Sequence, residues 1–202
     1  MASTSTHMQT KASVAPDIVQ IPERRALVIE GTGAPEGGEF ERSIQAIYGI
    51  TYTMKFERRH AGNGDIPIGP LEGDWWVQGA GGNASVDRAR WRWRLRMTVP
   101  DDVTDSEVQN AIAKATTRKN GKLFDSAEAG RVSLKRLPRS RCGRILHVGP
   151  YATEPESFAK LEALLAEHGL RREPWHTEVY LSDPRRTNPE NLKTVLLVEV
   201  DG

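Results

Sequence analysis

The stretch from Arg88 to Val99 limits the possible folds more than any other part of the chain, because its residues alternate strictly. Every second residue from Arg88 to Arg96 is an arginine, and the residues between and after them are Ala89, Trp91, Trp93, Leu95 and Met97. Successive side chains point to opposite faces in a β-strand, so this period predicts a strand with one basic face and one apolar face.

Arginines beside tryptophans also occur on platforms that bind single-stranded nucleic acid, where bases stack on rings and phosphates are neutralised. The alternation argues against this role, since Trp91 and Trp93 lie on the face opposite the arginines. The formal net charge of the chain is +1, so no wider basic field supports it. We therefore expect a solvated or salt-bridged outer face, and no stable nucleic-acid binding.

A second predicted strand, from His176 to Leu181, carries polar groups on one face. The turn signal Ser182-Asp183-Pro184 ends it. His176, Glu178 and Tyr180 share one face, and the alternate residues form an ordinary apolar face. The polar row is either an acid-base or cation-binding arrangement that lines a cavity, or a solvated sheet face.

Two long helices and one shorter helix follow from apolar spacing and capping residues. The long helices are predicted from Glu39 to about Arg58 and from Thr153 to Gly169. The shorter helix follows Thr104, which forms a capping box with Glu107. Residues 121–130 are expected to be irregular, and further strands are expected over 18–21, 25–30, 68–77, 130–137, 141–148 and 194–200.

The order strand, long helix, strand, strand occurs twice, over about 24–99 and about 141–200, with a helical connector at 100–140. This repetition predicts an α+β fold of two pseudo-symmetric β-α-β-β units, with antiparallel sheets around a central ligand cleft. Residues 17–202 are expected to form a single domain. Residues 1–16 are poor in apolar side chains and are predicted to be a disordered N-terminal segment.

Composition excludes several classes of protein. Cys142 is the only cysteine, so the chain has no internal disulfide, and we expect a buried, unreactive thiol. The five histidines lack ligand-like spacing, so no metal is expected. Gly31-Thr32-Gly33 lacks the rest of a phosphate-binding fingerprint, so no cofactor is expected. No apolar run approaches a membrane span, and we expect a cytoplasmic protein without membrane contact.

The aromatic residues allow both a core and a ligand-binding interpretation. Trp75 and Trp76 are adjacent in a predicted strand, so at most one of them enters the main core. The other lies on the opposite face, where a pocket, a ligand or a partner has to cover so large an aromatic side chain. Tyr48 and Tyr52 are four residues apart and share one helix face, as core residues or as part of an aromatic cage. Trp93 has the same two interpretations.

Several motifs in the C-terminal half resemble the GyrI-like small-molecule-binding family. They are His147-Val148-Gly149-Pro150-Tyr151, Glu178 to Thr187, and Leu192-Lys193-Thr194-Val195-Leu196. Members of this family include drug-sensing effector domains of transcription regulators. The resemblance implies two β-α-β-β units of the SHS2 type around a ligand cleft, with Glu178 at the position of a glutamate that contacts the ligand.

The N-terminal half resembles one branch of that family more closely. Tyr48 to Lys55, Pro70-Leu71-Glu72-Gly73 followed by Trp75, and Pro100-Asp101 with Val103-Thr104 look like the stand-alone branch that includes cyclopropanoid cyclopropyl hydrolases. These enzymes detoxify DNA-alkylating natural products of the duocarmycin, yatakemycin and CC-1065 type within an aromatic cage. Trp76 and Trp175 match no position of the family pattern, so their proposed cage roles rest on chemistry alone.

The resemblance implies a hydrolase that needs no cofactor. Glu178 is the expected general base that orients water, and Tyr52 or Tyr180 is the expected hydrogen-bond donor to the substrate. The expected ligand-binding residues are Trp75, Trp76, Trp93, Tyr48, Tyr151, Trp175, His147 and His176. For both histidines a hydrogen-bonded structural role is the competing interpretation.

The main alternative is a protein that binds planar or cationic aromatic ligands and sequesters them without turnover, since a glutamate among aromatic rings holds a cation well. An effector domain of a DNA-binding regulator is less favoured, because no helix-turn-helix precedes residue 17. In every case the expected partner is a planar aromatic small molecule, and the expected state is a monomer or a weak homodimer.

Overall fold

The computed structural model describes residues 10–77, 88–117 and 126–201. Its strands are β1 (Asp17–Ile21), β2 (Arg24–Thr32), β3 (Leu71–Val77), β4 (Trp91–Val99), β5 (Ser133–Leu137), β6 (Ser140–Val148), β7 (Arg171–Arg172), β8 (His176–Tyr180) and β9 (Lys193–Asp201). Its helices are α2 (Gly38–His60), α3 (Asp105–Thr117), α4 (Ser126–Arg131) and α5 (Glu154–Glu167), with short 3-10 turns at η1 (Arg88–Arg90), η2 (Tyr151–Thr153) and η3 (Pro189–Asn191).

Within the described residues, the strands form a nine-stranded sheet in the order β1-β6-β9-β8-β3-β4-β2-β5, with β7 beside β9. Every pair is antiparallel. One half of the sheet comes from the unit β2-α2-β3-β4 and the other from β6-α5-β8-β9, and the pairing of β3 with β8 joins them. The predicted α+β fold of two β-α-β-β units is therefore confirmed.

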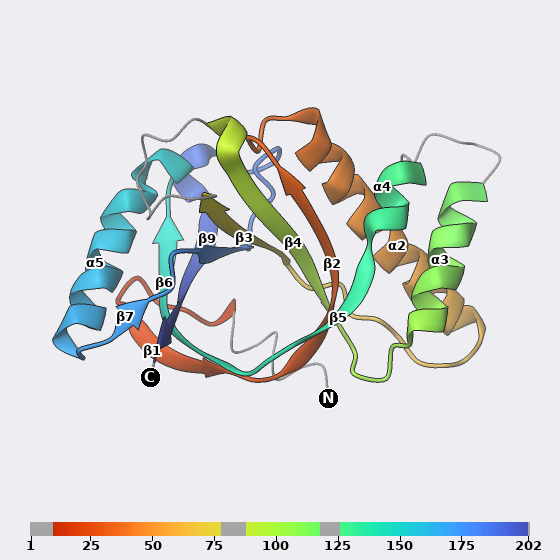
Figure 1. The fold of residues 1–202 in the computed structure, drawn as a ribbon, viewed down its shortest axis with the longest axis horizontal. Helices are drawn as coiled ribbons and strands as arrows, with labels where there is room; N and C mark the ends of the chain where they lie inside the picture. The colour runs from red at the N-terminus through yellow and green to blue at the C-terminus, as the bar shows by residue number, and fades with distance from the viewer. Residues whose placement is uncertain (1–9, 78–87, 118–125, 202) are drawn as a thin grey trace.

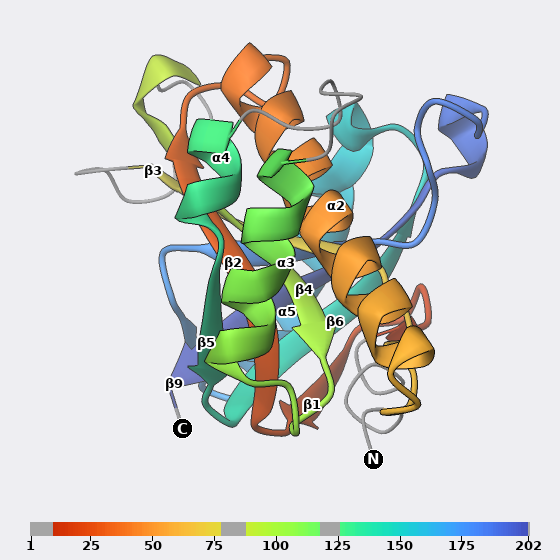
Figure 2. The ribbon, with the colours of Figure 1, turned by 90° about the vertical axis from the view of Figure 1, so that its right-hand side faces the viewer.

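The sheet curls into a half-barrel with its long helices outside. Figure 1 shows α5 against one side of the curl, with α2, α3 and α4 against the other. The turned view in Figure 2 shows α2, α3 and α4 together in front of the strands. The outer face thus carries the helices and the inner face lines the hollow of the curl. No helix within the described ranges is both long enough and apolar enough to cross a membrane.

Strand register decides which residues share a face, because residues directly opposite each other in paired strands point the same way. Glu178 lies opposite Gly73, and His176 lies opposite Trp75. Trp75 in turn lies opposite Trp93. The polar row of β8 and the apolar row of β4 therefore share the outer, helix-covered face.

The main hydrophobic core fills the space between this outer face and α2. Trp93 is 0% exposed, and Trp75 packs beside it with 6% exposure. Phe40 of α2 contacts both indoles, at ring-centroid distances of 5.2 Å. A second core cluster, which includes Leu161 and Leu165, lies under α5. As predicted, only one of the two adjacent tryptophans enters the main core.

The arginine face of β4 turns inward. Arg96 is 6% exposed, and its Nη2 lies 3.0 Å from Glu72 and 2.8 Å from Asp74. Arg94 donates to Asp74 at 2.6 Å, and Arg24 to Glu72 at 3.0 Å. A salt-bridged face is confirmed for these residues, but the expectation of an outer face is wrong for Arg96, since the curl of the sheet encloses it.

Burial alone would raise the pKa of Glu72, but the guanidinium groups of Arg24 and Arg96 hold that pKa below its ordinary value. Glu72 therefore stays ionised inside the half-barrel. The residues Arg24, Glu72, Asp74, Arg94 and Arg96 form what we call the inner ion ladder.

Outside the sheet, the predicted capping box is confirmed, but part of the predicted irregular segment is helical. The capping box is present, since the Thr104 backbone N–H donates to Glu107 at 2.8 Å. The irregular segment predicted at 121–130 is wrong for its second part, where α4 begins at Ser126, and residues 121–125 lie outside the described ranges. Residues 1–9 of the predicted N-terminal segment also lie outside the described ranges. Further along that segment, the Ser13 carbonyl accepts a hydrogen bond from the Leu146 backbone N–H at 2.8 Å.

Candidate functional site

The central strand β8 places Glu178 among polar and aromatic neighbours. His176 Nε2 lies 3.2 Å from Glu178 Oε1, and their side chains are 26% and 13% exposed. Tyr180 follows two residues later and lies on the same face of the strand. Trp75 Nε1 donates to the Tyr180 hydroxyl at 3.0 Å. The strand period thus places an imidazole, a carboxyl group and a phenol in one row, and the phenol accepts a hydrogen bond from an indole.

Gly73 makes room for this row. A Cβ at Gly73 would lie 3.0 Å from both Trp75 Nε1 and the Tyr180 hydroxyl oxygen, closer than nearly all real contacts of that kind. Gly73 lies opposite Glu178 in the pairing of β3 with β8. The glycine that interrupts β3 therefore lets the indole and the phenol meet beside the carboxylate.

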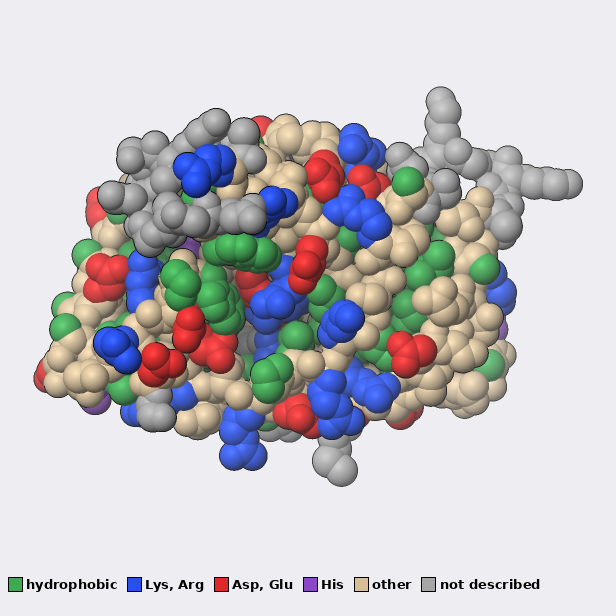
Figure 3. Space-filling view, viewed as in Figure 1, with side chains coloured by type: hydrophobic (Ala, Val, Ile, Leu, Met, Phe, Trp, Pro, Cys, Tyr) green, Lys and Arg blue, Asp and Glu red, His purple; other side chains and the backbone are tan. Residues whose placement is uncertain are grey.

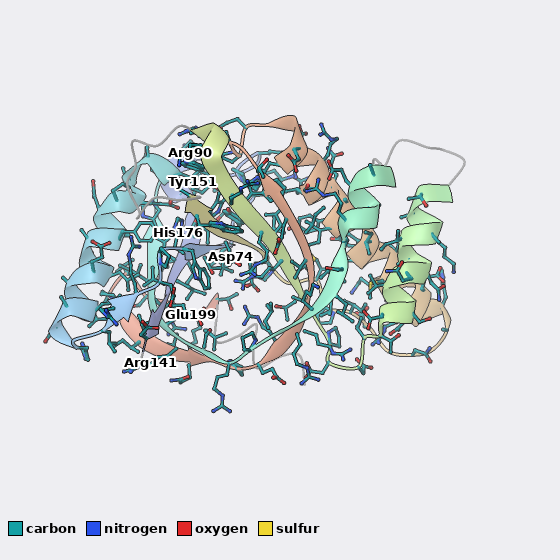
Figure 4. The ribbon with its side chains drawn as sticks, in the orientation of Figure 1. Asp74, Arg90, Arg141, Tyr151, His176 and Glu199 are labelled. Carbon is teal, nitrogen blue, oxygen red and sulfur yellow. The ribbon has the colours of Figure 1, made fainter. Side chains whose placement is uncertain are left out.

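Residues at the start of α5 close one side of the row. The Tyr151 ring stands perpendicular to the Tyr180 ring at a centroid distance of 6.4 Å, and Tyr151 is 40% exposed. Phe158 contacts the His176 ring at 4.9 Å. Figure 4 shows Tyr151 and His176 on the α5 side of the molecule. We call His176, Glu178, Tyr180, Trp75 and Tyr151 the Glu178 cluster.

Both tyrosines of the cluster are neutral phenols. Burial, and after it the charges of Glu178 and Glu154, raise the pKa of Tyr151 to about 12. Burial and the neighbouring Glu178 also raise the pKa of Tyr180 well above its ordinary value. Each phenol therefore keeps its proton at neutral pH and can donate a hydrogen bond.

Glu154, which the sequence did not single out, belongs beside this cluster. It is the first residue of α5 and is only 8% exposed, and its Oε1 has no hydrogen-bond partner among the described residues. Burial, and then the charge of Glu178, raise the pKa of Glu154 to about 9. A glutamate in a first helical turn is ordinarily an exposed partner of the helix dipole, so no local pattern indicates that Glu154 is buried.

The α2 tyrosines form a separate aromatic stripe. Tyr48 stacks on Tyr52 at 6.5 Å, and Tyr52 on Phe56 at 6.4 Å, with Tyr52 43% exposed. No contact among the described residues joins Tyr52 to Glu178. Of the two tyrosines predicted as hydrogen-bond donors, Tyr180 is the one that the fold places against the carboxylate.

The predicted tryptophans are distributed over both faces of the sheet. Trp75 touches Tyr180, whereas Trp93 is enclosed in the core. Trp76 lies on the inner face beside Arg92, and Trp175 lines the hollow of the half-barrel with Thr177. The fold therefore brings one of these four tryptophans, Trp75, to Tyr180, and a ligand-binding role remains a prediction for all four.

His147 and Cys142 occupy ordinary structural positions. His147 is 4% exposed, with Nδ1 2.9 Å from Ser157 Oγ and Nε2 3.1 Å from the Pro150 carbonyl oxygen. Cys142 is buried, and burial raises the pKa of its thiol, which agrees with the expected unreactive thiol. Within the ranges that the structure describes, no three potential metal-ligating side chains come together.

The inner face holds a cavity of about 350 Å³, and Figure 3 shows the hollow with basic and acidic side chains around it. Its lining includes Arg94, Arg96, Trp175 and Glu199. The charged groups of the inner ion ladder already neutralise one another there. The Glu178 cluster is the better candidate site, because among the described residues its carboxyl group contacts no lysine or arginine.

The fold and this cluster define a small-molecule-binding protein, and comparison with known sequences agrees. Residues 98–201 match the model of the GyrI-like small molecule binding domain, and the chain belongs to this family. No curated protein is similar enough to count as a match.

Solved structures extend the similarity over nearly the whole chain. An uncharacterised conserved protein from Listeria innocua is 33% identical, with a TM-score of 0.85 over 95% of this chain and 94% of its own. A hydrolase from Listeria innocua is 32% identical, with a TM-score of 0.83 over 95% and 94%. The EcmrR C-terminal domain, at 12% identity and a TM-score of 0.54 over 92% and 96%, shares the fold alone.

Proposed function

We propose that this protein hydrolyses the cyclopropane ring of cyclopropanoid DNA-alkylating natural products of the duocarmycin, yatakemycin and CC-1065 type, and so detoxifies them. The observation that carries the proposal is the Glu178 carboxyl group, whose side chain is 13% exposed, on the same strand face as the neutral phenol of Tyr180. The hydrolases from Listeria innocua, 32% and 31% identical to this chain, support hydrolytic chemistry.

The substrate class carries a cyclopropane fused to a cyclohexadienone. Attack by water forms a C–O bond and breaks a cyclopropane C–C bond, and the electron pair moves through the ring to the dienone oxygen. The ring becomes aromatic, so the reaction is downhill and needs positioning more than strong activation. Overall, the product gains one water.

Glu178 acts as the general base in this proposal, and Tyr180 acts as the hydrogen-bond donor. Glu178 accepts a proton from the attacking water while Tyr180 donates a hydrogen bond to the dienone oxygen, where charge develops. Acid-base assistance of this kind contributes roughly 100- to 10,000-fold. The Tyr180 hydroxyl accepts a hydrogen bond from Trp75 Nε1, which leaves its own proton for the dienone oxygen.

The aromatic neighbours suit an extended flat ligand. Tyr151 is 40% exposed and so offers ring surface, while Trp75 is nearly buried and fixes the Tyr180 hydroxyl instead. Flat ligands gain about 0.5–1.5 kcal/mol from each good aromatic contact beyond simple burial. Tyr151 is therefore proposed as the wall of the site, and Trp75 as a positioning residue.

The direct test is incubation with a cyclopropanoid alkylator, followed by mass spectrometry for a product heavier by one water. Glu178→Gln is expected to lower the rate by about 100-fold or more while the alkylator still binds. Tyr180→Phe should also slow the reaction, and Tyr52→Phe, on the separate stripe, is the matched control that should not. A wild-type protein that adds no water contradicts the proposal.

A second candidate function is sequestration of aromatic cations without turnover. One observation favours it: among the described residues Glu178 contacts His176 but no lysine or arginine. A carboxylate without a lysine or arginine partner, set among aromatic rings, is suited to a cation. Protection that saturates at one alkylator per protein, with unchanged ligand recovered, is the result expected for sequestration.

A further inference from the structure

The hollow on the inner face of the half-barrel is separate from the Glu178 cluster. Its volume is about 350 Å³, and small-molecule sites usually measure about 300–1,000 Å³. Thr177 of β8 lines the hollow, whereas its neighbour Glu178 points to the other face, so the sheet itself divides the two places. The proposed hydrolysis makes no use of the hollow.

The lining of the hollow combines apolar side chains with guanidinium groups. Among the apolar residues are Ile21, Leu137 and Leu197, and the guanidinium groups of the inner ion ladder that line it are Arg24, Arg94 and Arg96. Figure 3 shows lysine and arginine side chains gathered in the hollow. Such a lining suits a ligand with an apolar body and a polar head.

The guanidinium groups of Arg24 and Arg96 are enclosed but incompletely bonded. The two residues are 5% and 6% exposed, and the Nε of each has no hydrogen-bond partner among the described residues. Arg96 Nη2, by contrast, lies 3.0 Å from Glu72, 2.8 Å from Asp74 and 3.2 Å from Thr177 Oγ1. Buried charged groups normally have all their N–H groups bonded, so the described chain compensates these two guanidinium groups only in part.

The charges of the inner ion ladder are unequal. It has three guanidinium groups but only two carboxylates, Glu72 and Asp74. The ion pairs therefore neutralise both carboxylates and leave one positive charge over. A negatively charged ligand group in the hollow would balance that charge.

The remaining charged lining residues lie toward solvent, with one exception. Lys135 and Arg136 are exposed, and the Glu30 side chain is 64% exposed. Solvent and salt screen charges in such positions. Glu199 is half-buried, and it is the lining residue that opposes an anion in the enclosed part of the hollow.

Trp175 supplies a flat apolar surface to the same lining. It is half-buried, and none of the ring contacts among the described residues involves it. An indole gains from contact with another aromatic ring beyond simple burial. The apolar body that fits beside it is therefore a planar ring system.

We propose that the hollow binds a planar aromatic carboxylate of one or two rings, with its carboxylate toward Arg24 and Arg96 and its ring against Trp175. The carboxylate brings the negative charge that the inner ion ladder lacks, and oxygens that accept from guanidinium N–H groups. Binding involves no covalent step. It goes beyond the proposed function and does not depend on it.

The test is calorimetric titration of the wild-type protein with 2-naphthoate and with its neutral isostere 2-naphthamide. Naphthoate should bind at least about tenfold more tightly, because its hydrogen bonds with guanidinium groups are charge-assisted. Naphthamide offers the same rings without the charge. Equal affinities for the two compounds, or no binding of naphthoate, overturn the proposal.

Three variants place the bound naphthoate. Trp175→Ala should weaken its binding by roughly 3- to 10-fold through the lost ring contact. Glu199→Gln should strengthen it by roughly 2- to 5-fold, because the opposing charge is removed, and misfolding cannot produce such a gain. Glu156→Gln, on the exposed side of α5, is the matched control and should leave the affinity unchanged. An affinity that stays the same in Trp175→Ala or in Glu199→Gln overturns the placement in the hollow.

Glu178→Gln separates this inference from the proposed function. It should leave the affinity for naphthoate unchanged, since Glu178 lies on the other side of the sheet. A gain in affinity would place the anion beside Glu178 and overturn the proposal. Hydrolysis of a cyclopropanoid alkylator is measured by a gain of one water, so either conclusion can fail while the other holds.

Discussion

At the scale of single residues, two glutamates of the same chain differ sharply because their surroundings differ. Glu156 lies on the exposed side of α5, whereas Glu154, two residues earlier, is buried. Burial and Glu178 raise the pKa of Glu154 to about 9 in the folded state, while the unfolded chain keeps an ordinary value near 4.5. The folded protein therefore binds one more proton than the unfolded chain between these two values.

This difference predicts how stability depends on pH. A proton bound more tightly in the folded state favours folding at low pH, and that contribution is lost as pH rises from about 4.5 toward about 9. Glu154→Gln, which cannot ionise, should therefore raise the melting temperature more at pH 8 than at pH 5. Glu156→Gln is the exposed control and should shift it little at either pH. An equal shift of Glu154→Gln at both values contradicts the assignment.

At the scale of elements, the pairing of β2 with β4 depends on the close approach of the Trp93 ring to the backbone of Gly31. Gly31 lies opposite Trp93, and a Cβ on Gly31 would fall far inside van der Waals contact with the Trp93 ring. The ring is 0% exposed and packs against Phe40 of α2, so it has no free space to move into. The absence of a side chain at Gly31 therefore allows the Trp93 ring to pack between β2 and α2.

Gly31→Ala should accordingly destabilise the protein by about 1–3 kcal/mol, since added atoms in a packed core force a rearrangement. Gly130→Ala is the matched control, because a Cβ there meets nothing within 4 Å and Gly130 lies inside α4. That control should stabilise the protein by about 0.5–1 kcal/mol. Urea unfolding measures both, and equal midpoints would contradict the packing described for Trp93.

At the scale of the whole molecule, the curl of the sheet turns one charged face into an interior. Glu72 and Arg96 are 1% and 6% exposed although both belong to a polar strand face. Three strands contribute to the inner ion ladder, since Arg24 is in β2, Glu72 and Asp74 in β3, and Arg94 and Arg96 in β4. The ladder therefore couples these neighbouring strands inside the half-barrel.

Removing Glu72 should leave two guanidinium groups without their shared partner. Glu72→Gln is expected to destabilise the protein by about 3–5 kcal/mol, the usual effect of breaking a buried pair. Glu30→Gln is the control, since Glu30 is 64% exposed and lies 4.0 Å from Arg94, and it should change stability by less than about 1 kcal/mol. Chemical denaturation distinguishes them, and a loss for Glu72→Gln no larger than for the control would contradict a buried ladder.

The strand periods in the sequence are sufficient to predict which residues share a face. The alternation of β8 put His176, Glu178 and Tyr180 in one row, and the same alternation puts Trp175 with Thr177 on the opposite face. The role expected for Trp175 in the wall around Glu178 stays a prediction, although Trp175 lines the hollow on that opposite face. The succession of strands and helices likewise predicted the two β-α-β-β units, because backbone geometry and capping are local properties.

Only the tertiary structure decided which face is enclosed and which distant groups meet. The arginine period of β4 is the same whether its face is solvated or buried, and the curl of the whole sheet encloses Arg96. The start of α5 is expected from the sequence to be an exposed acidic turn, whereas in the fold Glu154 is only 8% exposed. Local sequence cannot specify these contacts, since they depend on long-range packing and on the water that this packing excludes.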